Sequence, residues 1–178
     1  MTAVYESADI NTATEAEQIA AVKKTPKIFL QITNPSEAVC LAAVKRSKNT
    51  FIHIPNPSLA VQLVAVQKNG WFLQIITNPT PAVQLAAVQQ AAGAIRYIKN
   101  PSETVQLAAI KYNSIVLELI DNPTHRVAMT ALLNIITYNI YGDFVKTLLR
   151  TQLQKLHKLH PDWEELDTIA DSAGVELN

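Results

Sequence analysis

An Asn-Pro dipeptide that recurs at a fixed interval restricts the fold of this chain more than any other feature. The interval is 22 residues, and it separates Asn34-Pro35, Asn56-Pro57, Asn78-Pro79, Asn100-Pro101 and Asn122-Pro123. One step further back lies Thr12-Ala13, so residues 12–143 divide into six repeats. Periods of this length are typical of proteins that stack short structural units on one another.

Four positions of the repeat keep one residue type. Position eight is Ile, Leu or Met, position eleven is a branched aliphatic residue, and position twenty-one is Ile in the first five repeats. Position ten is alanine in all six repeats: Ala21, Ala43, Ala65, Ala87, Ala109 and Ala131. We expect alanine where neighbouring helices approach too closely for a larger side chain.

Local signals predict two helices in each repeat. Asn would cap the first helix, and Pro suits its first position, so that this helix would run to position thirteen, as in 57–68. A second, shorter helix would follow, as in 71–76, and would end before the next Asn-Pro. The first helix is apolar almost all round, so it must be buried on several sides. β-Branched runs such as 115–120 leave a β-solenoid as the alternative.

We therefore expect an all-α protein, a right-handed α-solenoid of six HEAT-like helix-turn-helix repeats with C-terminal capping helices. Residues 1–11 would form a flexible N-terminal arm, residues 12–143 the solenoid and residues 144–178 a helical cap. In the cap region we expect a helix from Asp143, which would cap it, to about residue 160. A last helix over 162–173 would end at Gly174. Such a cap would cover the apolar end of the repeat array.

The repeats resemble a family of short repeats in bacterial, phage and giant-virus proteins. The resemblance is carried by Asn-Pro-Ser-Glu-Thr-Val-Gln-Leu-Ala-Ala-Ile over residues 100–110, and it covers residues 12–143. Repeat one departs from the pattern at Thr12 and Ala13, and repeat six departs from it after Ile136. The resemblance implies helical repeats without catalysis, and it suggests a phage-encoded protein that binds or inhibits a host factor.

Composition excludes several classes of protein. Lys and Arg number 15, as do Asp and Glu, and this balance argues against a general nucleic-acid or membrane-surface binder. We find no secretory signal and no run of about 20 apolar residues. Cys40 is the only cysteine, so no disulfide can form within the chain. These features predict a cytoplasmic protein, located in the host cytoplasm if a phage encodes it.

Catalytic and metal-binding signals are weak. Cys40 and His53 could belong to a hydrolase triad, but Cys40 replaces a Gln in a column that we expect to be buried. His157 and His160 have a spacing that can hold a metal, but no third ligand accompanies them. The four glycines are scattered, so a phosphate-binding loop is absent. We expect no enzyme activity, no cofactor and no metal.

Basic and aromatic side chains are the candidate binding residues. Residues 12–99 contain nine Lys or Arg and three Glu, and stacking would align several of the basic residues in a stripe. The alternatives are an ordinary solvated face for the charges and core packing for the aromatic residues. The candidates are Lys23, Lys24, Lys45, Arg46, Lys68, Trp71, Arg96, Tyr97, Lys111 and Tyr112.

Position seven carries a polar side chain inside an apolar arc. Gln62, Gln84 and Gln106 occupy it in three successive repeats. A buried amide needs hydrogen-bond partners, so we expect a structural role in which each Gln bonds to the loop of the adjacent repeat. A row of amides that lines a binding surface is the alternative.

The sequence therefore predicts a non-catalytic scaffold that binds a macromolecule, most readily a protein, and acts by occlusion or bridging. Two alternatives remain. The basic stripe of repeats one to four could bind nucleic acid, with affinity that falls steeply with salt. Incompletely capped ends could make the chain a self-associating structural protein and thus a homo-oligomer. We expect no association with membranes.

Overall fold

The computed structural model describes residues 9–137 and 142–177, and for 142–146 it describes only the backbone. Throughout these residues the chain forms helices and no strand, which excludes the β-solenoid for the described repeats. Residues 1–8 of the predicted N-terminal arm and Asn139 and Tyr141 of repeat six lie outside the described residues.

The chain divides into two compact parts, residues 1–94 (the N-terminal part) and residues 95–178 (the C-terminal part). Each repeat in the N-terminal part consists of an α-helix followed by a six-residue 3₁₀-helix. The elements are α1 (Glu15–Lys24), η1 (Pro26–Gln31), α2 (Glu37–Arg46), η2 (Lys48–His53), α3 (Leu59–Lys68), η3 (Gly70–Ile75) and α4 (Pro81–Gln90). Helix η4 (Ala92–Tyr97) contains the boundary between the two parts.

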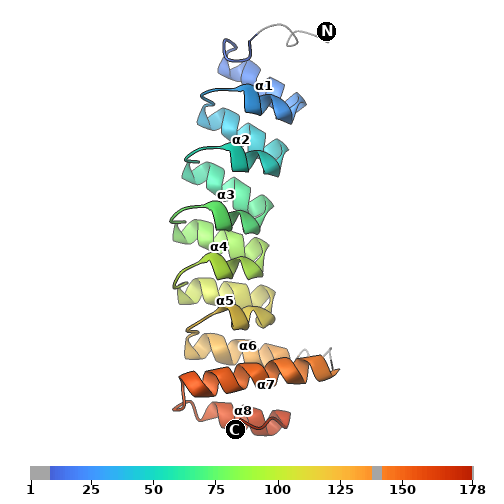
Figure 1. Cartoon of the computed structure of the whole chain (residues 1–178), viewed down its shortest axis with the longest axis vertical. Helices are drawn as coiled ribbons and strands as arrows, with labels where there is room; N and C mark the ends of the chain where they lie inside the picture. The colour runs from blue at the N-terminus through green and yellow to red at the C-terminus, as the bar shows by residue number, and fades with distance from the viewer. Residues whose placement is uncertain (1–8, 138–141, 178) are drawn as a thin grey trace. The chain divides into compact units, whose positions relative to one another are not determined.

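Successive repeats of the N-terminal part pack against each other in chain order. Helix α1 lies against α2, α2 against α3, and α3 against α4, while η3 packs against both α3 and α4. Figure 1 shows α1 to α4 side by side, with the shorter 3₁₀-helices as a second layer in front of them. The expected helical repeat array is confirmed at this level.

The residue that caps each α-helix is not the predicted Asn. The Ser or Thr at position three is the N-cap, and in α3 the hydroxyl of Ser58 accepts a hydrogen bond from the backbone N–H of Val61 at 3.4 Å. In repeats two to six the α-helix thus begins two residues after the proline, as in Leu59–Lys68. The Ser or Thr hydroxyl caps the helix in place of the Asn side chain, because the Asn adopts a backbone conformation that cannot start a helix.

That conformation is left-handed. The φ angles of Asn56, Asn78 and Asn100 are 48°, 52° and 56°. Asn tolerates this region better than most residues with a Cβ atom, because its short polar side chain can bond locally. The Asn of each of these three Asn-Pro pairs therefore reverses the chain between a 3₁₀-helix and the next α-helix.

The Glu at position four stands three residues after Asn, a spacing that is typical of a capping box with Asn as the cap, but no such box forms in the repeats that carry it. Glu37 and Glu103 are not partners in a capping box, since each is the first residue of its helix. The carboxylate of Glu37 instead accepts a hydrogen bond from the Ser58 hydroxyl in the next repeat. A capping box does form in α1, but between Thr14 and Glu17.

The second helix of repeats one to five is a 3₁₀-helix rather than the expected short α-helix. A 3₁₀-helix has three residues per turn, so residues three apart share a face. Positions eighteen and twenty-one are buried, as Phe51 and Ile54 are in repeat two, and they anchor this layer. A six-residue 3₁₀-helix with this spacing buries one narrow apolar edge. An α-helix would place positions eighteen and twenty-one less directly above each other.

The predicted core columns differ in burial. All six alanines of position ten are buried, between 0% and 3% exposed, and the residues of position eleven are 0% exposed. The Leu residues at position eight, such as Leu63 and Leu85, are only half-buried. The α-helices are therefore covered on the 3₁₀ side and by their neighbours, while their outer side remains open.

Glycine is required where η3 meets α4. A Cβ atom on Gly70 would overlap with the carbonyl oxygen of Ala87. The N–H of Gly70 also donates a hydrogen bond to the side-chain oxygen of Gln90. This close contact brings the 3₁₀ layer of one repeat directly onto the α-helix of the next.

The C-terminal part continues the pattern and then departs from it. Its elements are α5 (Glu103–Tyr112), η5 (Ser114–Leu119), α6 (His125–Thr137), α7 (Gly142–Leu159) and α8 (Glu165–Ala173). Asp143 lies inside α7 rather than capping it, and α8 begins three residues later than predicted. Gly174, with φ 64°, ends α8 as expected. Within the described residues, none of the helices has the length and apolar character needed to span a bilayer.

Candidate functional site

The predicted basic candidates of the N-terminal part gather at one edge of the repeats. All seven Lys and Arg of residues 9–94 lie in the last turn of an α-helix or at the start of the 3₁₀-helix that follows, and all are exposed. We call this set the basic edge: Lys23, Lys24, Lys27, Lys45, Arg46, Lys48 and Lys68. The acidic residues of the same part lie before α1 or in the first turns of α1 and α2.

Helix electrostatics explains part of the basic edge. The partially negative C-terminal ends of α1 and α2 lie side by side, as the hydrogen bond between Arg46 at the end of α2 and Lys23 near the end of α1 shows. Lysine and arginine in the last turns offset this accumulated dipole charge. Arg46 does so directly, because its Nε donates a hydrogen bond of 3.0 Å to the carbonyl oxygen of Lys23 in the preceding repeat.

Trp71 lies next to the basic edge and is 44% exposed. Its indole ring lies over Gly93, where a Cβ atom would approach the Cη2 atom of Trp71 to 2.9 Å. Glycine at this position of the next repeat therefore makes room for one side of the ring. Trp71 nevertheless keeps a large exposed apolar surface, and tryptophan is the residue type most often found to anchor a partner protein.

The 3₁₀-helices expose a second row that sequence reasoning missed. Position nineteen carries Leu30 in η1 and Ile52 in η2, each 59% exposed, and position twenty carries Ile75 in η3, 53% exposed. These helices are neighbours: η1 contacts η2, and the rings of Phe51 and Phe72 lie 5.2 Å apart between η2 and η3. The sequence did carry a signal for this row. Apolar residues three apart, at positions eighteen and twenty-one, indicate a 3₁₀-helix that leaves positions nineteen and twenty exposed.

We call the exposed side of η1 to η3 the η face. It consists of positions sixteen, nineteen and twenty, namely Lys27, Leu30, Gln31, Asn49, Ile52, His53, Trp71, Gln74 and Ile75. None of these nine residues is acidic. Four of them, Leu30, Ile52, Trp71 and Ile75, are large apolar side chains that form an apolar row along the η face. Lys27 belongs both to this face and to the basic edge.

A small pocket opens on the η face between η1 and η2. Its volume is about 230 Å³, and its lining includes Pro26, Lys27, Leu30, Asn49 and His53. Pockets that bury a drug-sized ligand usually exceed about 300 Å³. The size and the partly apolar lining suit a single inserted side chain better than a complete small molecule.

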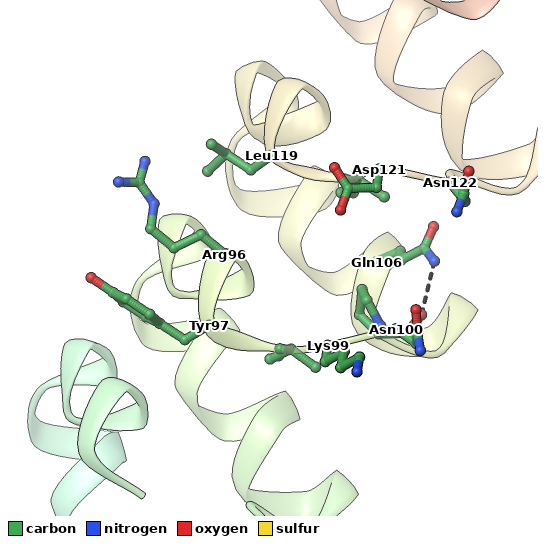
Figure 2. Close-up of a pocket in the computed structure, with 11 residues that line it drawn as sticks. Arg96, Tyr97, Lys99, Asn100, Gln106, Leu119, Asp121 and Asn122 are labelled. Carbon is green, nitrogen blue, oxygen red and sulfur yellow. Dashed lines mark hydrogen bonds between the residues drawn. The ribbon is translucent and has the colours of Figure 1, made fainter. Parts of the chain in front are cut away.

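A larger pocket of about 580 Å³ lies in the C-terminal part. Figure 2 shows Arg96 and Tyr97 at one end of it, and Gln106 with Asn100 and Asn122 at the other. Two predicted binding residues, Arg96 and Tyr97, are thus brought together. Lys111 and Tyr112 lie instead in the last turn of α5, where both are exposed.

The glutamines of position seven bond mainly within their own repeats. The Nε2 atoms of Gln62, Gln84 and Gln106 donate to the carbonyl oxygen of the proline five residues earlier, at 2.8, 3.0 and 2.8 Å. The predicted link to the adjacent repeat occurs at Gln106, whose Oε1 accepts a hydrogen bond of 3.4 Å from the N–H of Thr124. These amides hold the turns after Asn-Pro in place.

The geometry around Cys40 gives no support to a nucleophile. The thiol is buried and lies 3.9 Å from the carbonyl oxygen of Pro35, and burial raises its pKa above the ordinary value. A reactive cysteine requires a lowered pKa. Across the described residues, no three His, Cys, Asp or Glu side chains are grouped to hold a metal, and His160 stacks on Trp163 at 3.9 Å.

Comparisons of the chain with protein-family models, with curated proteins and with solved structures found no match.

Proposed function

We propose that this chain is a non-catalytic protein-binding scaffold that acts by occlusion or bridging. The observation that carries the proposal is the η face, where Leu30, Ile52, Trp71 and Ile75 expose apolar surface on three neighbouring helices. Single exposed apolar residues are common on proteins, but a continuous row bordered by polar groups marks interaction sites. The repeat architecture supports the proposal, since stacked repeats present long surfaces to macromolecules.

The finer architecture is part of the same proposal. The repeats would stack as a right-handed, HEAT-like α-solenoid closed by the C-terminal helices. The resemblance of the repeats to those of phage and giant-virus proteins suggests that the partner is a host factor in the cytoplasm. Binding would then block or bridge surfaces of that factor without chemistry.

Nucleic acid is the second candidate partner, because the basic edge gathers seven positive charges without an interspersed acidic residue. The two candidates differ in their dependence on salt. Contacts to phosphates make affinity fall steeply as salt rises, roughly in proportion to the number of phosphates neutralised. A partner held mainly by apolar contacts on the η face would lose little affinity.

Site-specific photo-crosslinking tests the proposed function. A photoreactive residue replaces Ile52 on the η face in one variant and Leu59 in the other, and both variants are exposed to extract of cells that encode the chain. Leu59 is the matched control because it is 49% exposed in the first turn of α3, outside the 3₁₀ layer. We expect a protein adduct at position 52 and none at position 59.

Three results contradict the proposal. They are the absence of an adduct at position 52, equal adducts at both positions, and an adduct that nuclease removes. An adduct with a second copy of the chain, together with concentration-dependent light scattering, would indicate the self-associating structural protein instead.

A further inference from the structure

We infer that the η face binds an acidic amphipathic α-helix of the partner protein. This inference rests on the proposed function and adds the chemical nature of the partner. Three observations carry it: the spacing of the exposed apolar side chains, the sign of the charges around them, and the small pocket between η1 and η2.

The spacing of the apolar row fits an α-helix that lies across the repeats. Leu30 and Ile52 occupy the same position of adjacent repeats, and Ile75 follows one position later in the third. Packed neighbouring helices lie about 8–10 Å apart. Seven residues of an α-helix advance about 10.5 Å, so a helix with an apolar residue in each heptad would meet one repeat per heptad.

The charges around the row require an acidic partner. Lys27 lies on the η face itself, while Lys48 and Lys68 lie close to it at the start of η2 and the end of α3. All three are exposed. Complementary charge fixes the register of a bound segment and disfavours basic competitors. A helix with Glu or Asp beside its apolar stripe would place these carboxylates over the lysines.

The 230 Å³ pocket supplies an anchor point within this surface. Leu30 and Pro26 form its apolar wall, and Lys27, Asn49 and His53 add polar groups. One apolar side chain of the bound helix would enter it, as in other complexes in which a helix inserts its apolar residues into a groove. The adjacent apolar contacts at Ile52 and Ile75 would then exclude water around that anchor.

The chain has an acidic helix of its own, but that helix cannot be the occupant. Residues 161–178 contain six Asp or Glu and no Lys or Arg, and α8 lies among them. Its apolar residues Leu166 and Ala170 are already buried in the C-terminal part. A second copy of the chain would therefore present carboxylates without a free apolar stripe, so the occupant is a different protein.

Fluorescence anisotropy with designed peptides tests the inference. The probe is a labelled 21-residue helical peptide with Leu in each heptad and Glu on both flanks, and its sister peptide carries Lys in place of each Glu. We expect the acidic peptide to bind the intact chain at least tenfold more tightly than the basic sister. The double variants Leu30→Ser/Ile52→Ser and Lys27→Glu/Lys48→Glu should each weaken binding of the acidic peptide at least tenfold.

Matched controls separate local effects from loss of fold. Leu59→Ser removes an exposed apolar side chain outside the η face, and Lys158→Glu reverses an exposed charge on α7. Both should bind the acidic peptide within twofold of the unaltered chain, and circular dichroism should be the same for all variants.

Equal binding of the two peptides overturns the inference, as do equal losses in Leu59→Ser and Leu30→Ser/Ile52→Ser. Tighter binding of a 20-nucleotide single strand than of the acidic peptide also overturns it, in favour of nucleic acid. If the peptide fails while position 52 still crosslinks to a protein, the acidic helix is wrong and the proposed function stands.

Discussion

The N-terminal and C-terminal parts of the molecule bury similar numbers of aliphatic residues, but the packing that buries them differs. In the N-terminal part the same positions are buried in repeat after repeat, and seven Lys or Arg accompany five Asp or Glu. In the C-terminal part α7 spans 18 residues, and eight Lys or Arg accompany ten Asp or Glu. The first part depends on repetition, and the second on contacts between unlike elements.

The clearest example of the second kind surrounds Trp163. His160 stacks on its indole at 3.9 Å between ring centroids, and His125 meets it edge-on at 4.8 Å. His125 also lies 3.5 Å from the carboxylate of Glu165. This cluster joins the start of α6 to the turn before α8, and the ionic part of the contact requires a protonated imidazole.

The two parts should therefore lose stability in response to different changes. Apolar columns and backbone caps do not titrate near neutral pH, so the repeats should be sensitive to changes of side-chain volume and of backbone conformation. The C-terminal part should depend in addition on contacts between unlike side chains, such as the one between Glu165 and His125. The following four experiments test this contrast, in order of decreasing expected effect.

Truncation of a 3₁₀ anchor should have the largest effect. Leu73 is 2% exposed at position eighteen of η3, so Leu73→Ala should lower the free energy of unfolding by about 2–5 kcal/mol through lost contacts and a cavity. Urea titration followed by circular dichroism measures the change. Ile75→Ala, two residues away but exposed, should change it by less than about 0.5 kcal/mol. Similar small losses in both would mean that the 3₁₀ layer does not stabilise the repeats.

Enlargement of the alanine column should rank second. Ala87 is 0% exposed on α4, and Ala87→Leu should destabilise the chain by about 1–3 kcal/mol because the neighbouring helices leave no room. Thermal melting measures the loss. Ala82→Leu on the exposed side of the same helix is the control and should melt near the unaltered chain. Equal melting of the two variants would contradict close packing at position ten.

Substitution in a left-handed turn should have a smaller effect. Asn78 has φ 52°, a region that costs most residues with a Cβ atom about 1–2 kcal/mol. Asn78→Ala should therefore lower the free energy of unfolding by roughly 1 kcal/mol, the lower end of that range, because the turn can relax around alanine. Asn78→Gly should remain within a few tenths of the unaltered chain. An alanine variant as stable as the glycine variant would remove the conformational reason for the recurring Asn.

Removal of acidic residues in the two parts should have the smallest effects, and these effects should depend on pH through different contacts. Hydrogen bonds from the backbone N–H and the hydroxyl of Thr14 lower the pKa of Glu17. The pKa of Glu165 is lowered mainly by a hydrogen bond from the backbone N–H of Glu165 itself, and further by the contact with His125. A lowered folded-state pKa stabilises the fold fully above the unfolded-state value, near 4.5, and this contribution is lost as pH falls through the folded-state pKa.

Melting temperatures between pH 7 and pH 3 test these two carboxylates. Glu17→Gln and Glu165→Gln should each lower the melting temperature most above about pH 4.5, and each loss should shrink as the pH falls further, because protonation of the native carboxylate removes its contribution. His125→Gln should reduce the loss caused by Glu165→Gln, because it removes one contact of that carboxylate, and it should leave the loss caused by Glu17→Gln unchanged. A Glu165→Gln loss that is the same with and without His125 would argue against this contact.

Much of the repeat could be predicted because its signals are local and occur several times. The period, the burial of positions ten, eleven and twenty-one, and the end of the first helix at position thirteen in repeats one to five follow from residue type and spacing alone. The start of that helix could not be placed correctly, because Asn and the following Ser or Thr are both good caps. Only the left-handed backbone at residues such as Asn78 decides between them.

The η face illustrates what spacing by itself leaves open. Leu30 and Ile52 are as apolar as the buried Leu73, so composition cannot distinguish an exposed from a buried aliphatic residue. The distinction depends on whether the second helix turns every 3.6 or every 3.0 residues. An alternation with period three was present in the sequence, but six residues are too few to establish it without the packing partner.

The 22-residue recurrence of Asn-Pro and the alanine shared by all six repeats are sufficient to predict a helical repeat, because few other arrangements tolerate a dipeptide that interrupts the chain so regularly. Residue type and spacing do not predict which apolar side chains are buried and which form an exposed row next to the basic edge. Burial depends on the direction in which a side chain points, and packing between elements sets that direction, as where η3 lies against α4 at Gly70 and Ala87.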